Sequence, residues 1–138
     1  QMGNPGAWRF LSGGKWADAS AVPDALCEGM ASEFSVSYLP ALGRYVVVYT
    51  QGGMLGKIMV RTAPRPEGPW GRPVEVYECP DVKWHEKAFS YAAKAHPELA
   101  SSPDELIITY ATNSTHFPDL MEDARLYWPR FVRVTLSR

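Results

Sequence analysis

Two segments of the sequence carry polar or charged side chains at alternate positions, a spacing that places side chains on one face of a β-strand. Glu33 begins the first segment, and Lys94, His96 and Glu98 alternate in the second. Hydrolysis of a glycosidic bond requires two carboxyl groups across one cleft, one protonated and the other ionised. A lysine beside a carboxylate favours its ionised form. We therefore predict Glu33, His96 and Glu98 as catalytic residues and Lys94 as a substrate-binding residue.

Further polar and aromatic side chains are candidates for binding the substrate. Ser35 stands at the place in the first segment that His96 takes in the second. Asn113 follows a strand-like run, which predicts a position at the rim of the same pocket. Tyr91 and Trp128, together with Trp84, supply aromatic rings that can stack on sugar rings. The structural alternative is that His96 and Glu98 hydrogen-bond neighbouring blades or cap a turn.

Known metal and cofactor motifs fit the sequence poorly, and we predict neither a metal nor a cofactor. Residues 52–57, GGMLGK, approach a phosphate-binding loop, but the glycine spacing is one residue short and Ile58 replaces the required Ser or Thr. His85-Glu86 lacks the second histidine of a zinc-binding helix. Cys27 and Cys79 are too few for a zinc site, so they either form a disulfide or remain buried thiols.

The candidate residues lie in two similar units built of short strands. Each unit has a run with alternate polar positions, a turn, and an apolar run that ends in an aromatic residue. Tyr49 and Tyr110 hold equivalent places, an offset of 110 − 49 = 61 residues. The same offset matches Glu33 to Lys94. An internal repeat of short strands is typical of a β-propeller or a related radial array.

The predicted fold class is all-β, with about two four-stranded antiparallel blades of a partial five-bladed propeller. The expected strands are Glu33–Leu39, Tyr45–Thr50, Lys57–Ala63 and Val74–Tyr77 in the first unit, and Lys94–Ala100, Leu106–Thr112 and Arg130–Leu136 in the second. Residues 1–138 then form a single partial propeller domain, in which residues 31–79 are a complete blade and residues 88–138 supply three strands of a further blade. Residues 7–16 are predicted as an outer strand.

Three further expectations concern how these units are completed. Ala7–Ser12 should pair with Arg130–Leu136, within one chain or between copies. Two blades cannot close a ring, so further blades from the rest of the protein or from other copies are expected. His85–Ala95 is rich in helix-forming residues, although the repeat favours a strand there, and Asp119–Leu126 is expected to form a short helical turn.

Composition excludes some classes of partner. The formal net charge is −1, which gives no electrostatic basis for binding nucleic acid or an anionic membrane. No apolar run approaches the roughly 20 residues of a membrane span, and no signal peptide is recognisable. A secreted protein, extracellular or periplasmic, remains the expectation for a chain that acts on polysaccharide.

Several of these segments carry a resemblance to a known family. Tyr91–Leu99, Glu105–Tyr110 and Tyr127–Val134 resemble the C-terminal blades of a bacterial domain-of-unknown-function family of five-bladed propellers. Tyr45–Tyr49 and Gly68–Trp70 resemble its preceding blade. The family is related in architecture to arabinanase-type glycoside hydrolases, and some members are endo-arabinanases. The earlier blades, which would carry catalytic acids, have no counterpart here.

The resemblance and the polar residues together imply a glycoside-hydrolase-like propeller that acts on a polysaccharide. Hydrolysis would belong to the complete propeller only. The alternative is a carbohydrate-binding or scaffold propeller without chemistry, which needs aromatic and amide groups but no pair of carboxylates. A purely structural β domain would lack a polar pocket altogether.

Overall fold

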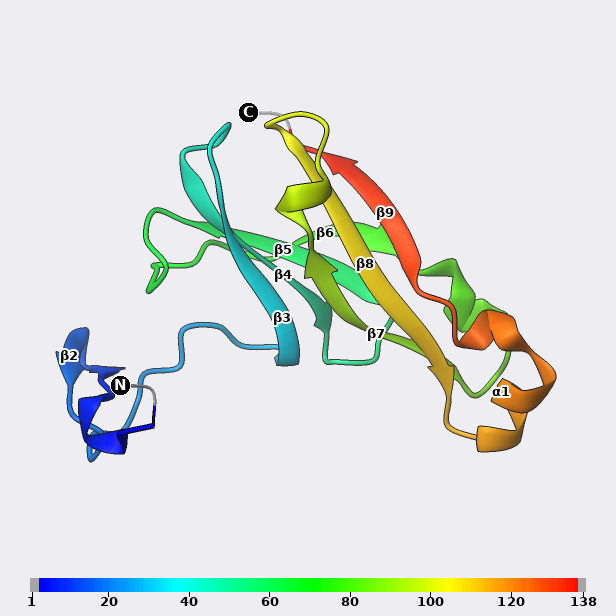
Figure 1. The fold of residues 1–138 in the computed structure, drawn as a ribbon, viewed down its shortest axis with the longest axis horizontal. Helices are drawn as coiled ribbons and strands as arrows, with labels where there is room; N and C mark the ends of the chain where they lie inside the picture. The colour runs from blue at the N-terminus through cyan, green and yellow to red at the C-terminus, as the bar shows by residue number, and fades with distance from the viewer. Residues whose placement is uncertain (1–2, 137–138) are drawn as a thin grey trace.

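The computed structural model describes residues 3–136, which form three antiparallel sheets and a few short helices (Figure 1). A small hairpin pairs β1 (Phe10–Ser12) with β2 (Lys15–Ala17). The four-stranded sheet contains β3 (Met30–Leu39), β4 (Arg44–Gln51), β5 (Lys57–Ala63) and β6 (Val74–Glu78). The three-stranded sheet contains β7 (Ala88–Ala95), β8 (Glu105–Ser114) and β9 (Arg130–Thr135). The predicted all-β class is confirmed, and the two larger sheets are consistent with blades of a partial propeller.

The helical segments lie in the connections between strands. They are the 3-10 helices η1 (Pro5–Ala7), η2 (Pro80–Lys83), η3 (Pro97–Leu99) and η4 (Ala124–Leu126), and the α-helix α1 (Phe117–Glu122). The short helical turn expected within Asp119–Leu126 is therefore confirmed. Within the described residues, no helix has the length and apolar character needed to cross a membrane.

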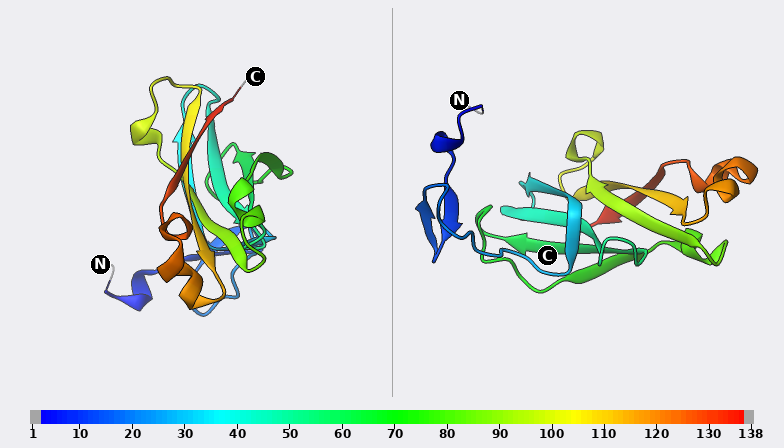
Figure 2. Two further views of the ribbon diagram at one scale, coloured as in Figure 1. Left: turned by 90° about the vertical axis from the view of Figure 1, so that its right-hand side faces the viewer. Right: turned by 90° about the horizontal axis from the view of Figure 1, so that it is seen from below.

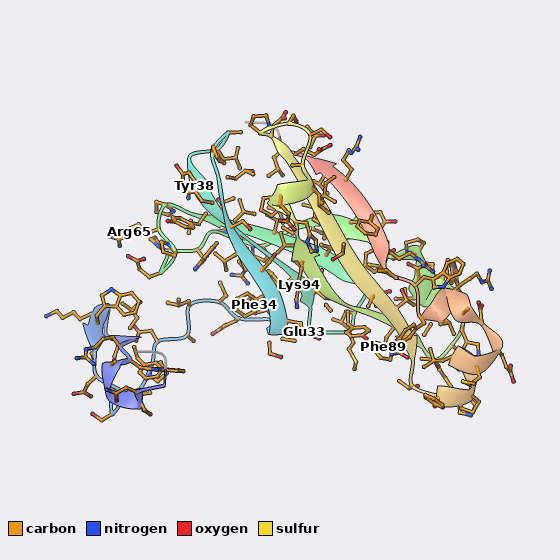
Figure 3. The ribbon with its side chains drawn as sticks, in the orientation of Figure 1. Glu33, Phe34, Tyr38, Arg65, Phe89 and Lys94 are labelled. Carbon is orange, nitrogen blue, oxygen red and sulfur yellow. The ribbon has the colours of Figure 1, made fainter. Side chains whose placement is uncertain are left out.

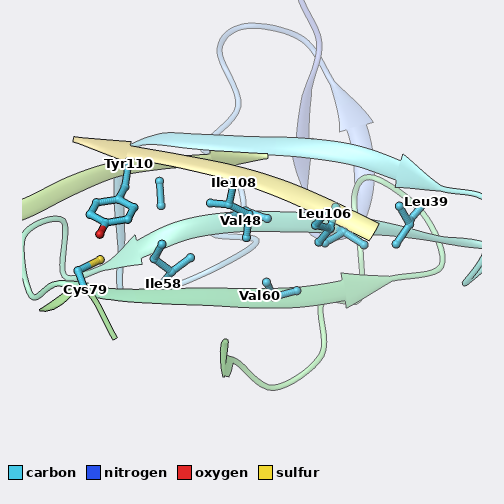
Figure 4. Close-up of a cluster of buried hydrophobic side chains, with 10 residues drawn as sticks. Leu39, Val48, Ile58, Val60, Cys79, Leu106, Ile108 and Tyr110 are labelled. Atoms are coloured by element: carbon cyan, nitrogen blue, oxygen red, sulfur yellow. The ribbon is translucent and has the colours of Figure 1, made fainter. Parts of the chain in front are cut away.

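The two larger sheets stack face to face and enclose the main core (Figures 2 and 4). Alternation along the strands supplies this core, because every second side chain of a strand points to the same face. Val48 and Ile58 from the four-stranded sheet meet Leu106 and Ile108 from the three-stranded sheet, and all four are fully buried. Burial of this apolar surface is what holds the sheets together.

The two larger sheets have the same orientation in the stack, so that equivalent residues lie on equivalent faces. Tyr49 points away from the three-stranded sheet and packs with Val47 and Met59, whereas Tyr110 points toward the four-stranded sheet. Each tyrosine therefore lies on the face of its own sheet that would meet a preceding sheet. This repeated orientation is typical of consecutive blades of a propeller.

The polar residues of the two inner strands do not align as the 61-residue offset predicts. Ser35 pairs with Val48 and Lys94 pairs with Thr109. Because Val48 and Thr109 are equivalent in the repeat, Lys94 takes the place of Ser35 and not of Glu33. The cause is the connection to the next strand, because Ser35 and its partner Val48 are 13 positions apart whereas Lys94 and Thr109 are 15 apart, so the β7–β8 connection is two residues longer than the β3–β4 connection.

Two local predictions were wrong. The strand expected over Lys94–Ala100 ends at Ala95, since Pro97 has no N–H for a sheet and instead begins η3. Ala7–Ser12 does not pair with Arg130–Leu136 within one chain, because β1 pairs with β2 across a Gly13-Gly14 turn. Pairing of these segments between copies stays a prediction.

Both cysteines are free thiols, so the disulfide alternative is wrong for this structure. Cys79 is buried in the main core, and burial raises the pKa of its thiol to about 12. Burial also raises the pKa of the half-buried Cys27. We expect two free thiols in denaturant without reductant, because neither is bonded. In the native protein Cys27 should react with a thiol reagent well before Cys79, and a single free thiol or the reverse order would contradict this description.

Candidate functional site

The inner strands β3 and β7 lie side by side, as the repeat predicts (Figure 3). Ser35 Oγ accepts a hydrogen bond from the Ala95 amide at 2.7 Å. Thr50 Oγ1 accepts one from the Ala93 amide at 3.2 Å. Because Thr50 lies beside the irregular start of β3, the two bonds place β3 and β7 in the same direction. Ser35, predicted to bind substrate, here joins the two sheets.

Glu33 and Lys94, predicted as a catalytic and a substrate-binding residue, lie at these neighbouring strands. Ala93 and Ala95 pack toward the four-stranded sheet, so Lys94 between them points to the opposite face of its own sheet. Glu33 is exposed at the irregular start of β3, and within the described residues no ion pair joins it to Lys94. The structure therefore places Glu33 and Lys94 on neighbouring strands without a shared ionic contact.

His96 and Glu98 form a local hydrogen-bonded group at the end of β7. His96 Nδ1 lies 2.9 Å from Glu98 Oε1, and its Nε2 lies 2.8 Å from Thr109 Oγ1. A backbone hydrogen bond at Glu98 itself and the bond from His96 hold the pKa of the Glu98 carboxyl below its usual range. An ionised Glu98 suits the role of a base or hydroxyl acceptor and not that of a general acid.

The remaining predicted residues lie elsewhere. Tyr91 packs on Phe89 with ring centroids 5.3 Å apart, and Asn113 Oδ1 accepts a hydrogen bond from the Ser114 amide. Trp128 is 60% exposed and lines an apolar depression of about 400 Å³ beside α1 and η4. The eight predicted site residues are thus distributed over the inner strands, the start of β7 and the α1–η4 end.

A different part of the molecule forms a wide cleft of about 710 Å³. Its walls come from the N-terminal hairpin, from the segment that leads to β3, and from the loop between β5 and β6 (Figure 3, near Arg65). Two tryptophans, Trp16 and Trp70, line it. Asp24, Arg65 and Glu67 supply its charged groups. The cleft combines aromatic rings with polar groups, as small-molecule sites commonly do.

Asp24 fixes the hairpin wall of the cleft. Its carboxylate accepts hydrogen bonds from the amides of Gly13, at 2.9 Å, and Gly14, at 3.0 Å. Its own amide donates to the Leu11 carbonyl at 2.7 Å. Both glycines have positive φ, which a two-residue turn of this kind requires. The turn and the carboxylate therefore hold each other in place.

The β5–β6 loop is also fixed by local bonds. The Gly68 amide donates to the Arg65 carbonyl, and the Gly71 amide donates to the Thr62 carbonyl, both at 2.9 Å. Arg65 Nε lies 3.2 Å from Glu67 Oε1. Arg65 is largely exposed, so its guanidinium can bind a ligand while it remains near Glu67.

The charged groups of the cleft are suited to accepting hydrogen bonds. The amides of Gly14 and Gly13 hold the pKa of the Asp24 carboxyl below its ordinary value. Glu67 is paired with the guanidinium of Arg65. Among the described residues, no group of three or more His, Cys, Asp or Glu is placed to hold a metal ion. The arrangement can bind hydroxyl groups through the carboxylates of Asp24 and Glu67 and the guanidinium of Arg65.

The hairpin should loosen at low pH. Asp24 has a depressed pKa in the folded chain, so its contribution to stability is complete above the unfolded-state pKa and is lost as the pH falls through the folded value. We expect hydrogen exchange of the Gly13 and Gly14 amides to be slow near neutral pH relative to the intrinsic rate. Asp24→Ala should remove that protection at neutral pH, whereas Asp18→Ala, outside the turn, should leave it. Unchanged protection in Asp24→Ala would contradict this role.

A smaller polar group lies at the other end of the molecule, beside Trp84. Asp119 accepts hydrogen bonds from Ser114 Oγ at 2.5 Å and from His116 Nδ1 at 2.8 Å, and His85 Nδ1 lies 3.4 Å away. The bonds from His116 and Ser114 hold the pKa of Asp119 low. The space there is only about 110 Å³, so this group ties two loops together and leaves little room for a saccharide.

Sequence reasoning missed the cleft residues, although one signal was present. The segments around Trp16 and Trp70 resemble each other, because each places a tryptophan beside glycines near an outer strand. Asp24, Arg65 and Glu67 lie in connections without periodicity, and only the folded chain brings them together with the two tryptophans.

Comparison with known proteins gives one match. No curated protein sequence matches the chain. A family described as "Domain of unknown function (DUF5005)" matches residues 4–136. This span includes the hairpin, both larger sheets and every residue of the cleft. The chain therefore belongs to the DUF5005 family of domains of unknown function.

Proposed function

We propose that the chain is a carbohydrate-binding part of a propeller and that a polysaccharide binds in the cleft between the N-terminal hairpin and the β5–β6 loop. The observation that carries the proposal is the presence of Trp16 and Trp70 in one cleft with Asp24, Arg65 and Glu67. Trp16 is 64% exposed, so its indole is available to a ligand. Further blades, from the rest of the protein or from other copies, would cover the open faces of the two sheets.

The chemistry of a saccharide fits this combination of groups. A sugar ring has an apolar face of C–H groups, which packs on an indole, and hydroxyl groups around its edge. Carboxylates accept hydrogen bonds from those hydroxyls and a guanidinium donates to them, in both cases as stronger charge-assisted bonds. A cleft of about 710 Å³ falls in the size range of ligand sites.

The bonds made by the two carboxylates of the cleft, Asp24 and Glu67, favour binding over hydrolysis. Hydrolysis requires one protonated and one ionised carboxyl group. The amides of Gly14 and Gly13 hold the pKa of the Asp24 carboxyl below its ordinary value, and Glu67 is paired with Arg65. Both groups therefore suit the role of hydroxyl acceptors.

Hydrolysis by a complete propeller is a second candidate function. The observation that favours it is the parallel contact of the inner strands β3 and β7, which brings Glu33 near the region of Lys94. Residues from further inner strands would then complete a site with Glu33, His96 and Glu98. A relation to arabinanase-type propellers, and action outside the cell or in the periplasm, belong to this proposal as well.

The proposal is tested by titrating the chain with arabino-, xylo-, gluco- and manno-oligosaccharides and following tryptophan fluorescence. We expect at least one series to bind with a Kd on the order of 0.1–1 mM, the equivalent of about 4–5.5 kcal/mol. The same solutions are assayed for new reducing ends, and none are expected from this chain alone. Absence of binding by every series at millimolar concentration would contradict the proposed function.

A further inference from the structure

The cleft between the N-terminal hairpin and the β5–β6 loop has an excess of negative charge. Three charged side chains line it, Asp24, Arg65 and Glu67, so two carboxylates are present with one guanidinium. Arg65 and Glu67 form an ion pair, in which the arginine Nε lies 3.2 Å from the glutamate Oε1. Because the charges of this pair balance each other, the carboxylate of Asp24 is the excess charge of the cleft.

Asp24 has hydrogen-bond partners but no cationic partner. Each of its two carboxylate oxygens accepts one backbone amide, from Gly13 or from Gly14. A carboxylate has about four lone-pair sites, so each oxygen can accept a further bond from a ligand. Among residues 3–136, no lysine, arginine or histidine lies within ion-pair distance of this carboxylate. The low pKa of the Asp24 carboxyl keeps it ionised in mildly acidic solution as well.

The two indoles of the cleft also favour a cationic ligand. Trp16 is 64% exposed on the hairpin wall, and Trp70 lines the same cleft from the β5–β6 loop. The face of an indole attracts a cation more strongly than any other aromatic side chain does. A hydroxyl group can bind the carboxylate, but it carries no charge for the carboxylate or the indoles to attract. The lining of the cleft therefore favours a cationic group over a neutral one.

We propose that the polysaccharide bound in the cleft contains amino sugars, whose protonated amino group binds at Asp24 beside the two indoles. This inference rests on the proposed function, because the cleft is the saccharide site. The ammonium group donates charge-assisted hydrogen bonds to the carboxylate, while the apolar face of the ring packs on an indole. A saccharide with carboxylate groups is disfavoured, since it would meet the excess negative charge of the cleft.

Three trisaccharides with the same β-1,4 linkage test the inference in calorimetric titrations. Cellotriose has a hydroxyl group at C2 of each ring, the glucosamine trimer has an amino group there, and the N-acetylglucosamine trimer has a neutral amide. The buffer is mildly acidic, which keeps the amino groups protonated. We expect the amino trimer to bind at least tenfold more tightly than cellotriose, and the acetylated trimer to bind no more tightly than cellotriose. Added salt should weaken binding of the amino trimer only.

Two variants change the charge of the cleft in opposite directions. Asp24→Asn removes the excess negative charge, so the ratio of amino-trimer to cellotriose affinity should fall below threefold. Arg65→Gln adds one negative charge to the cleft, so the ratio should rise at least threefold above its original value. The Arg65 side chain is 68% exposed and forms no part of the hairpin turn, so this variant tests the inference even where Asp24→Asn disturbs the turn.

Glu75→Gln is the matched control. It changes the net charge of the chain by the same amount as Asp24→Asn, but Glu75 lies on β6 and does not line the cleft. The ratio should therefore stay at its original value in this variant. An equal fall of the ratio in Glu75→Gln and Asp24→Asn overturns the inference, because the amino trimer would then be attracted to the chain as a whole.

The outcomes separate this inference from the proposed function. A ratio near one, equal binding of the amino and acetylated trimers, or a ratio that does not rise in Arg65→Gln overturns the inference. If a neutral oligosaccharide binds and the amino trimer does not, the proposed function stands and the inference fails. If the amino trimer binds but Trp16→Ala leaves its affinity unchanged, the ammonium group binds outside the cleft, and the saccharide site and the inference fail together.

Discussion

Asp81→Ala should lower the free energy of unfolding by about 3–5 kcal/mol, the cost of removing one partner from a buried charge pair. Asp81 is 2% exposed and lies in η2, between the two larger sheets. It accepts hydrogen bonds from the Tyr110 hydroxyl at 2.5 Å and from Arg130 Nε at 3.2 Å. Without the carboxylate, a largely buried guanidinium and a buried hydroxyl lose their partner.

Urea unfolding of the variant and the unmodified chain measures this effect. Glu75→Ala is the control, since Glu75 forms an exposed ion pair with Lys57 and its loss should leave the unfolding midpoint within error. Tyr110→Phe should fall between the two, because Arg130 still pairs with Asp81. An Asp81→Ala variant as stable as the Glu75→Ala control would show that the described network does not join the sheets.

Trp16→Ala should weaken oligosaccharide binding by tenfold or more, which corresponds to at least about 1.4 kcal/mol. The indole is the most exposed aromatic ring of the cleft, so its truncation removes a stacking surface and leaves the core intact. Trp70→Ala should weaken binding similarly and also reduce stability, since Trp70 packs against Val47, Tyr49 and Met59.

Trp128→Ala is the matched control for these variants. Trp128 has a similar exposed fraction, 60%, but lines the separate depression at the α1–η4 end. Its removal should leave oligosaccharide affinity unchanged. If Trp128→Ala lost binding and Trp16→Ala kept it in full, the saccharide site would lie at Trp128, where the sequence analysis predicts stacking on the substrate.

The sheets could be predicted from the sequence because alternation of apolar side chains specifies both a strand and its buried face. Lys57–Ala63 was predicted with the bounds that the structure shows. Leu106–Thr112 was likewise predicted as a strand and lies within β8, where Leu106, Ile108 and Tyr110 face the other sheet. Such regular segments depend on local periodicity alone.

The polar positions could not be aligned in the same way. The β7–β8 connection is two residues longer than the β3–β4 connection, which moves Glu33 out of equivalence with Lys94. The 61-residue offset holds for β4 and β8 but was applied to the inner strands as well. Pro97 argues against a strand because it has no N–H to donate, but the prediction for Lys94–Ala100 followed the repeat instead.

The cleft was beyond sequence reasoning for a different reason. Trp16 and Trp70 are far apart in the chain and line one cleft, whose hairpin wall is shaped by the Gly13-Gly14 turn and its bonds to Asp24. Residues 7–16, which contain the Gly-Gly pair, were predicted as one outer strand. As a two-residue turn the pair would have predicted the hairpin directly.

The most direct test of carbohydrate binding in the cleft uses the five tryptophans of the chain as reporters. Each indole N–H gives one signal in a two-dimensional ¹⁵N–¹H spectrum, and single substitutions assign them. Addition of the oligosaccharide that binds best should shift the signals of Trp16 and Trp70 and leave those of Trp84 and Trp128 in place. Shifts confined to Trp84 or Trp128, or no shift of any indole at saturating oligosaccharide, would contradict the assignment of the cleft as the saccharide site.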